Sequence, residues 1–229
     1  MPETIPFIGA VLGGFLPVFL WLWFWLREDR KHPEPAHLLA LAFLAGMLAV
    51  AIVIPIQKSI QLVIVGGTLL FTAWSFAEEI IKYLLARATV LWRKDVDEPI
   101  DTVIYMVVVA LGFAAAENTL FLLSPLAGQS IIETALTGNL RFVGATLLHV
   151  LSSAVVGLCM AFAFYKSRQV KRLAVVSGVI LAALLHSAFN FLILNTPGEH
   201  LFKTFALVWL GVVVVLFLIE IVKRIHARR

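Results

Sequence analysis

The stretch IDTVIYMVVVALGFAAAENTLFLL, residues 100–123, is almost wholly apolar and long enough to cross the hydrocarbon core of a bilayer as one helix. Runs of similar length recur along the whole chain. We expect them at Ile5–Leu26, His37–Ile56, Gly67–Leu91, Ile100–Leu123, Arg141–Tyr165, Leu173–Leu194 and Leu201–Val222. This pattern predicts an all-α, polytopic transmembrane helix bundle of about seven spans, in which residues 1–229 form a single integral membrane domain.

The overall composition agrees with a membrane protein. Hydrophobic residues make up 61% of the chain and charged residues only 14%, against the roughly 25% charged residues of soluble domains. The formal net charge of +4 resides in short connections between apolar runs, so we interpret it as a topology signal and exclude nucleic acid as a partner. The lipid bilayer is the expected surrounding. The single cysteine, Cys159, leaves no possibility of an intrachain disulfide.

Lysine and arginine are concentrated in alternate connections, which predicts the orientation of the bundle. They are Arg27, Arg30, Lys31, Arg93, Lys94, Lys166, Arg168, Lys171 and Arg172, with Lys223, Arg224, Arg228 and Arg229 at the tail. The positive-inside rule then predicts an external N-terminus and a cytoplasmic C-terminus. The first run lacks a basic leader and is too long for a signal peptide, so we expect it to be retained as the first span.

The boundary before the third run is the least defined. The segment SIQLVIVGGTLL, residues 59–70, is compatible with an early helix, a re-entrant piece or a segment on the outer surface. Gly66 and Gly67 favour a break in the helix at this point.

Acidic, basic and histidine side chains well inside the apolar runs, away from their ends, are few. They are Glu78, Glu79, Lys82, Glu117, His149 and His186. A rise of about 1.5 Å per residue puts the carboxylates and imidazoles of four different helices at similar depth, about 11 to 16 Å below the outer ends. A buried carboxylate in a bilayer costs between ~3 and ~10 kcal/mol. The shared depth therefore predicts a functional site.

The spacing within two of the runs supports this site. Lys82 lies four residues after Glu78 and three after Glu79, so it can neutralise one carboxylate and leave the other available. His186 and Asn190 lie four residues apart, which puts an imidazole and an amide on one helix face. Such a pair can hold a water, a metal or a developing oxyanion.

Four segments in order resemble one known family: EEIIK at 78–82, FAAAE at 113–117, the isolated His149, and HSAFN at 186–190. Together they resemble the PrsW family, within the wider superfamily of CAAX-processing and bacteriocin-processing membrane proteases. Glu117 follows the PrsW version of a motif that resembles FxxxH elsewhere in that superfamily. The resemblance implies a protease of the bacterial cell membrane that cuts a transmembrane protein near the outer face, as in site-1 cleavage of an anti-sigma factor, with the paired glutamates and the histidines essential.

Two chemistries fit these residues. Without a metal, Glu78 is the general base, His186 and Asn190 stabilise the oxyanion, and His149 orients the water or protonates the leaving amine. With a divalent metal such as zinc, Glu117, His149 and His186 are the ligands and Glu78 remains the base. The alternative from another class is a proton- or ion-coupled transporter with a Glu/His relay, whose ionisable groups would be spread across the whole membrane thickness.

Overall fold

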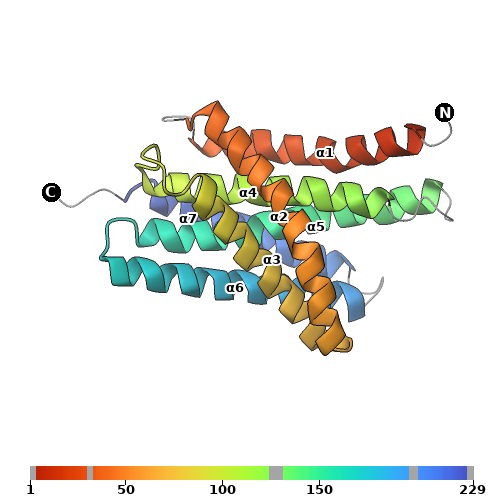
Figure 1. Cartoon of the computed structure of the whole chain (residues 1–229). Coiled ribbons are helices and arrows are strands. Elements are labelled where there is room, and N and C mark those ends of the chain that lie inside the picture. The colour runs from red at the N-terminus through yellow and green to blue at the C-terminus, as the bar shows by residue number, and fades with distance from the viewer. Residues whose placement is uncertain (1–3, 30–32, 124–130, 196–200, 226–229) are drawn as a thin grey trace.

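The computed structural model describes residues 4–29, 33–123, 131–195 and 201–225, and the regular structure of these ranges is entirely helical (Figure 1). The elements are α1 (Thr4–Leu26), the 3-10 helix η1 (Arg27–Asp29), α2 (Ala36–Val63), α3 (Gly67–Thr89), α4 (Pro99–Leu123), α5 (Ile131–Phe162), α6 (Arg168–Asn195) and α7 (Leu201–Val222). No strand occurs in the described ranges. The predicted all-α class is therefore confirmed.

Helix α4 forms the centre of the bundle. It is apolar on every side, as expected for a helix enclosed by other helices, and 18 of its 25 residues are buried. It packs against α1, α2 and α5. The contact with α2 is close because a Cβ on Gly46 would lie 2.0 Å from Val109 O, and one on Gly112 would lie 2.0 Å from Phe43 O. Small residues at such positions allow the two backbones to approach.

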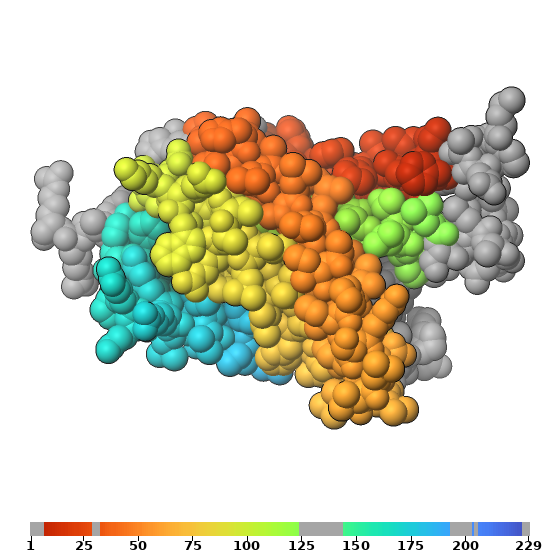
Figure 2. All heavy atoms as spheres, in the orientation of Figure 1, coloured from red at the N-terminus to blue at the C-terminus, as the bar shows by residue number. Residues whose placement is uncertain are grey.

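Helices α2 and α3 form a hairpin that crosses the other helices obliquely (Figure 1) and covers one face of the molecule (Figure 2). The turn between them has Gly66 at φ +67° and Gly67 at φ +76°, in the left-handed region that favours glycine. The predicted break at these glycines is thus confirmed. The predicted end of the second run at Ile56 was wrong, because α2 continues through Pro55 to Val63.

Two other helix starts differ from the predicted ones. Helix α5 begins at Ile131 rather than Arg141, and α6 begins at Arg168 rather than Leu173. The additional segment of α6, residues 168–172, is polar, and that of α5, residues 131–140, mixes polar and apolar residues, so apolar length alone did not include them. The remaining boundaries agree to within three residues.

Within the described residues, five helices are long and apolar enough to cross a membrane. These stretches are Phe7–Leu26, Ala36–Val63, Pro99–Leu123, Gly144–Phe162 and Arg168–Leu192, and α7 contains a shorter apolar segment, Ala206–Val222. Helix α3 differs because it carries four charged side chains. A total of seven spans and the orientation of the termini stay predictions. Of the basic residues behind that orientation, Arg30, Lys31, Arg228 and Arg229 lie outside the described residues.

Candidate active site

The ionisable side chains of four helices meet in one buried cluster. Helix α3 provides Glu78, Glu79 and Lys82, and α4, α5 and α6 provide Glu117, His149 and His186. Helix α3 packs against α2, α4, α5 and α6, so its charged face is enclosed by protein. Successive residues of a helix point about 100° apart, which lets the two adjacent glutamates contact different partners.

Glu79 is held by three side chains. Its Oε1 accepts a hydrogen bond from Lys82 Nζ at 2.5 Å and lies 3.0 Å from His186 Nδ1, while Oε2 accepts from Ser153 Oγ at 3.3 Å. The side chains of Glu79 and Lys82 are both 0% exposed. A buried ion pair is stable only when its remaining polar atoms are also satisfied, and this carboxylate meets that condition. Lys82 thus neutralises one of the two adjacent glutamates, namely Glu79.

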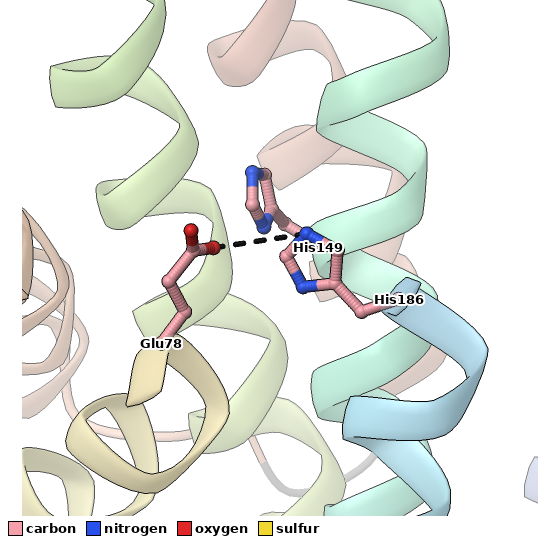
Figure 3. A group of neighbouring side chains, drawn as sticks. All are labelled: Glu78, His149 and His186. Carbon is pink, nitrogen blue, oxygen red and sulfur yellow. Dashed lines mark ion pairs between the residues drawn. The ribbon is translucent and has the colours of Figure 1, made fainter. Parts of the chain in front are cut away.

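Glu78 is held on one oxygen only. Its Oε1 accepts a hydrogen bond from Gln57 Nε2 at 2.8 Å. Its Oε2 is buried without a hydrogen-bond partner among the described residues, and lies 3.7 Å from His186 Nε2 (Figure 3). Buried polar atoms are nearly always hydrogen-bonded, and an unsatisfied carboxylate oxygen is among the costliest exceptions. This oxygen can accept a proton or ligate a cation.

The contacts of His186 define its tautomer. Its Nδ1 faces the Glu79 carboxylate, which only accepts, so the ring proton resides on Nδ1. The lone pair of Nε2 then points toward Glu78 (Figure 3). A carboxylate that orients an imidazole in this way is the usual outer partner of a metal-ligating histidine.

His149 is placed between a cation and an anion. Its Nδ1 lies 3.3 Å from Lys82 Nζ and its Nε2 lies 3.0 Å from Glu117 Oε2. Because an ammonium group only donates, Nδ1 accepts from Lys82 and Nε2 donates to Glu117. The Glu117 side chain is 27% exposed, whereas those of Glu78 and His186 are 8% and 3% exposed. The cluster is therefore most accessible at Glu117.

Three of these side chains are close enough together to hold a metal ion. Within the described part of the chain, ligand atoms of Glu78, His149 and His186 all lie within 4.8 Å of one another. The rings of the two histidines are 5.0 Å apart and nearly perpendicular. Two imidazole nitrogens and one carboxylate oxygen form a ligand set found at catalytic zinc sites. The sequence predicted Glu117 as the carboxylate ligand, and the structure has Glu78 in this group, with Glu117 beside His149.

Asn190 lies apart from this network of contacts. Its Nδ2 donates to Ser75 Oγ at 3.4 Å, and Ser75 Oγ in turn donates to Phe71 O at 2.9 Å. The Asn190 amide is therefore hydrogen-bonded to a side chain of α3.

Gln57 and Ser153 are two partners of the glutamates that the sequence did not indicate as part of the site. Gln57 is one of several polar residues that follow Pro55 in α2, so its sequence context did not separate it from the end of a span.

A helical bundle with several long apolar helices and a buried cluster of carboxylates and imidazoles agrees with the class of membrane-embedded proteases that the sequence motifs suggested. The sequence model described as PrsW family intramembrane metalloprotease matches residues 34–219. The chain therefore belongs to the PrsW family, and the resemblance drawn from the four motifs is confirmed.

Individual relatives agree with this assignment. Protease PrsW of Bacillus subtilis (strain 168) is 28% identical over 194 residues, covering 81% of this chain and 83% of the relative. Protease PrsW of Geobacillus kaustophilus (strain HTA426) is 27% identical over 192 residues, covering 81% and 80%. That of Oceanobacillus iheyensis is 26% identical over 220 residues, covering 93% and 94%. No solved structure matches the chain significantly. The protein is a membrane protease, a hydrolase of the bacterial cell membrane with several membrane-spanning helices.

Proposed function

We propose that this protein is a metal-dependent endopeptidase that cuts a transmembrane protein, with Glu78, His149 and His186 as the ligands of a divalent cation. The observation that carries the proposal is the buried Glu78 Oε2, which lacks a hydrogen-bond partner among the described residues and faces the Nε2 lone pair of His186 at 3.7 Å. Two ligand atoms are thus already oriented toward each other. His149 becomes the third ligand when one of its ring nitrogens gives up its contact with Lys82 or Glu117 and binds the cation instead.

The charge of the cluster fits a divalent cation. The ammonium group of Lys82 pairs with Glu79, whereas Glu78 Oε2 has no hydrogen-bond partner among the described residues, which leaves negative charge at Glu78 in a largely buried site. Excess charge inside a bilayer is costly unless it is paired. The mixed nitrogen and oxygen donors favour zinc among the common divalent ions. A cation held there would polarise the scissile carbonyl and acidify the attacking water.

The other residues of the cluster orient the ligands and move protons. Glu79 holds the His186 ring through Nδ1, and Lys82 and Ser153 hold Glu79. We assign proton transfer to Glu117, because it is the most exposed carboxylate of the cluster and contacts His149 Nε2. In this role Glu117 Oε2 takes the proton of the attacking water and returns it to the leaving amine.

The metal-free alternative, with Glu78 as base, has weaker support. In that chemistry Asn190 would help to stabilise the oxyanion, but its amide donates a hydrogen bond to Ser75.

The proposal includes the topology and the class of substrate. Seven spans with an external N-terminus and a cytoplasmic C-terminus would put the cluster between the midplane and the outer face, since Glu117 lies near the C-terminal end of α4. The scissile bond would then lie in the outer part of a transmembrane segment or just beyond it. The resemblance of the motifs to the PrsW family favours an anti-sigma factor as substrate. Family membership in a protease group favours hydrolysis over the transporter alternative.

The experiment combines metal analysis with cleavage. The full chain, purified in detergent, is analysed for bound zinc and mixed with a panel of single-span reporter proteins that carry an outer juxtamembrane segment. We expect one zinc per chain, loss of cleavage after chelation and recovery with zinc, and loss of both zinc and cleavage in His186→Ala. The matched control is His37→Ala, at an exposed histidine in the first turn of α2. Full cleavage by metal-depleted protein would instead support the metal-free chemistry.

A further inference from the structure

We propose that Gln57 of α2 is a positioning residue that sets the orientation of the Glu78 carboxylate. This inference rests on the proposed function, because it assigns Gln57 to the support of a metal ligand. The Gln57 Nε2 donates to Glu78 Oε1 at 2.8 Å, and the two residues are 21 positions apart on different helices. Gln57 thus acts through Glu78, the side chain that would hold the metal.

The geometry explains why Glu78 needs such a partner. The terminal torsion of a glutamate is broad and roughly two-fold, so a carboxylate held at neither oxygen has no single orientation. A carboxylate accepts hydrogen bonds, so the amide presents its nitrogen to Oε1. With Oε1 engaged by Gln57, Oε2 is the oxygen that lies 3.7 Å from His186 Nε2. The hydrogen bond from α2 therefore decides which oxygen faces the histidine.

A second hydrogen bond fixes Gln57 itself. The indole Nε1 of Trp74 donates to the main-chain O of Gln57 at 3.1 Å. Trp74 lies one helical turn before Glu78 on α3, so α2 and α3 are joined at this level by the side chain of Gln57 and by its backbone. This double connection limits the movement of the amide relative to Glu78. A hydrogen bond that served only to join two helices would not need to end on a carboxylate of the site.

Cobalt(II) titration of the purified full chain tests the inference, with the visible absorption of the bound ion as the readout. Gln57→Met keeps the length of the side chain and removes the donor. Because outer-shell partners of metal ligands typically contribute 10- to 100-fold to metal affinity, we expect about that loss of cobalt affinity, with an altered spectrum of the bound ion. The matched control is Gln61→Met, one turn further along α2 and exposed, which should bind cobalt like the unmodified chain.

Two further variants make the result specific. In the Glu78→Gln background, adding Gln57→Met should cause no further loss of cobalt affinity, because its effect is transmitted through Glu78. Trp74→Phe removes the indole donor without touching a ligand, and should weaken cobalt binding in the same direction by a smaller factor. Trp74→Phe also carries the test if Gln57→Met does not fold.

The outcomes separate this inference from the proposed function. Equal cobalt affinities and spectra for Gln57→Met and Gln61→Met would overturn the role of Gln57 and leave the proposed metal site unaffected. An additional loss in the Glu78→Gln background would also overturn it, because Gln57 would then act independently of Glu78. If the unmodified chain bound no cobalt and cleaved its reporters after chelation, both the proposed metal site and the positioning role of Gln57 would be contradicted.

Discussion

Two groups of buried carboxylates lie toward opposite ends of α4, and they differ in how their oxygens are used. Near the N-terminal end, Asp101 Oδ2 accepts hydrogen bonds from the backbone N–H groups of Asp97 at 2.9 Å and Glu98 at 2.7 Å, and the Tyr105 hydroxyl donates to Glu34 Oε2. An acid in the first turn that reaches back to preceding N–H groups is a helix cap. This group stabilises the start of α4.

Toward the other end, the cluster around Glu78 contains both kinds of carboxylate. Glu79 has hydrogen bonds or ion-pair contacts on both oxygens, as in a structural site, whereas Glu78 Oε2 has no hydrogen-bond partner among the described residues. Burial alone therefore does not distinguish the cap from the candidate active site. The distinguishing feature is a buried oxygen that the protein orients without satisfying, because such an oxygen is available to a ligand or a proton.

The sharpest test of this difference is Glu78→Gln. The amide keeps the size of the side chain but loses the charge, so we expect metal binding to be much weaker, with His149 and His186 as the remaining ligands, and cleavage to fall by about 10³-fold or more, with the fold retained. Zinc analysis, reporter cleavage and thermal unfolding in detergent measure the three quantities. Glu220→Gln, at an exposed carboxylate of α7, is the control and should behave like the unmodified chain. Full cleavage by Glu78→Gln would remove Glu78 from the catalytic chemistry.

Lys82→Met should affect folding most strongly. It leaves Glu79 buried without its ammonium partner and removes the donor to His149 Nδ1. Removing one partner of a buried ion pair typically costs about 3–5 kcal/mol, so we expect a loss of that size in the free energy of unfolding. Chemical denaturation in detergent measures it, with Lys58→Met at an exposed lysine of α2 as the control. Similar stabilities for the two variants would contradict the structural role of the Lys82–Glu79 pair.

Asp101→Ala should separate stability from activity. Two part-buried backbone N–H groups lose their charged acceptor, which should lower the free energy of unfolding by about 1–3 kcal/mol. Zinc content and cleavage per folded molecule should remain unchanged, because the cap lies at the other end of α4 from Glu117. Loss of cleavage by fully folded Asp101→Ala would mean that both groups of carboxylates belong to the functional site.

The smallest expected effect comes from two adjacent serines of α5. Ser153 Oγ donates to Glu79 Oε2, whereas Ser152 Oγ is buried without a hydrogen-bond partner among the described residues. We expect Ser153→Ala to lower the free energy of unfolding by about 1–2 kcal/mol and Ser152→Ala to change it by less than about 0.5 kcal/mol. The same denaturation measurement on both variants provides an internal control. The reverse order would show that the partner of Glu79 is wrongly identified.

Part of the candidate site could be predicted because it depends on local periodicity. The apolar runs located the helices, and matched depths on successive runs indicated that Glu78, Glu79, Glu117, His149 and His186 would approach one another. The length of α2 could not be read in the same way. Its polar residues after Pro55 resemble the end of a span, whereas the helix continues because α3 packs beside it.

The sequence by itself determined the class of fold, the family and the set of ionisable residues, because these depend on composition, helical period and the order of motifs. Only the tertiary structure decided that Lys82 pairs with Glu79, that His186 presents Nε2 to Glu78, and that Gln57 approaches from α2. Two adjacent residues of one helix have nearly identical local signals but point about 100° apart. Their different surroundings come from helices far away in the chain, whose packing no local pattern specifies.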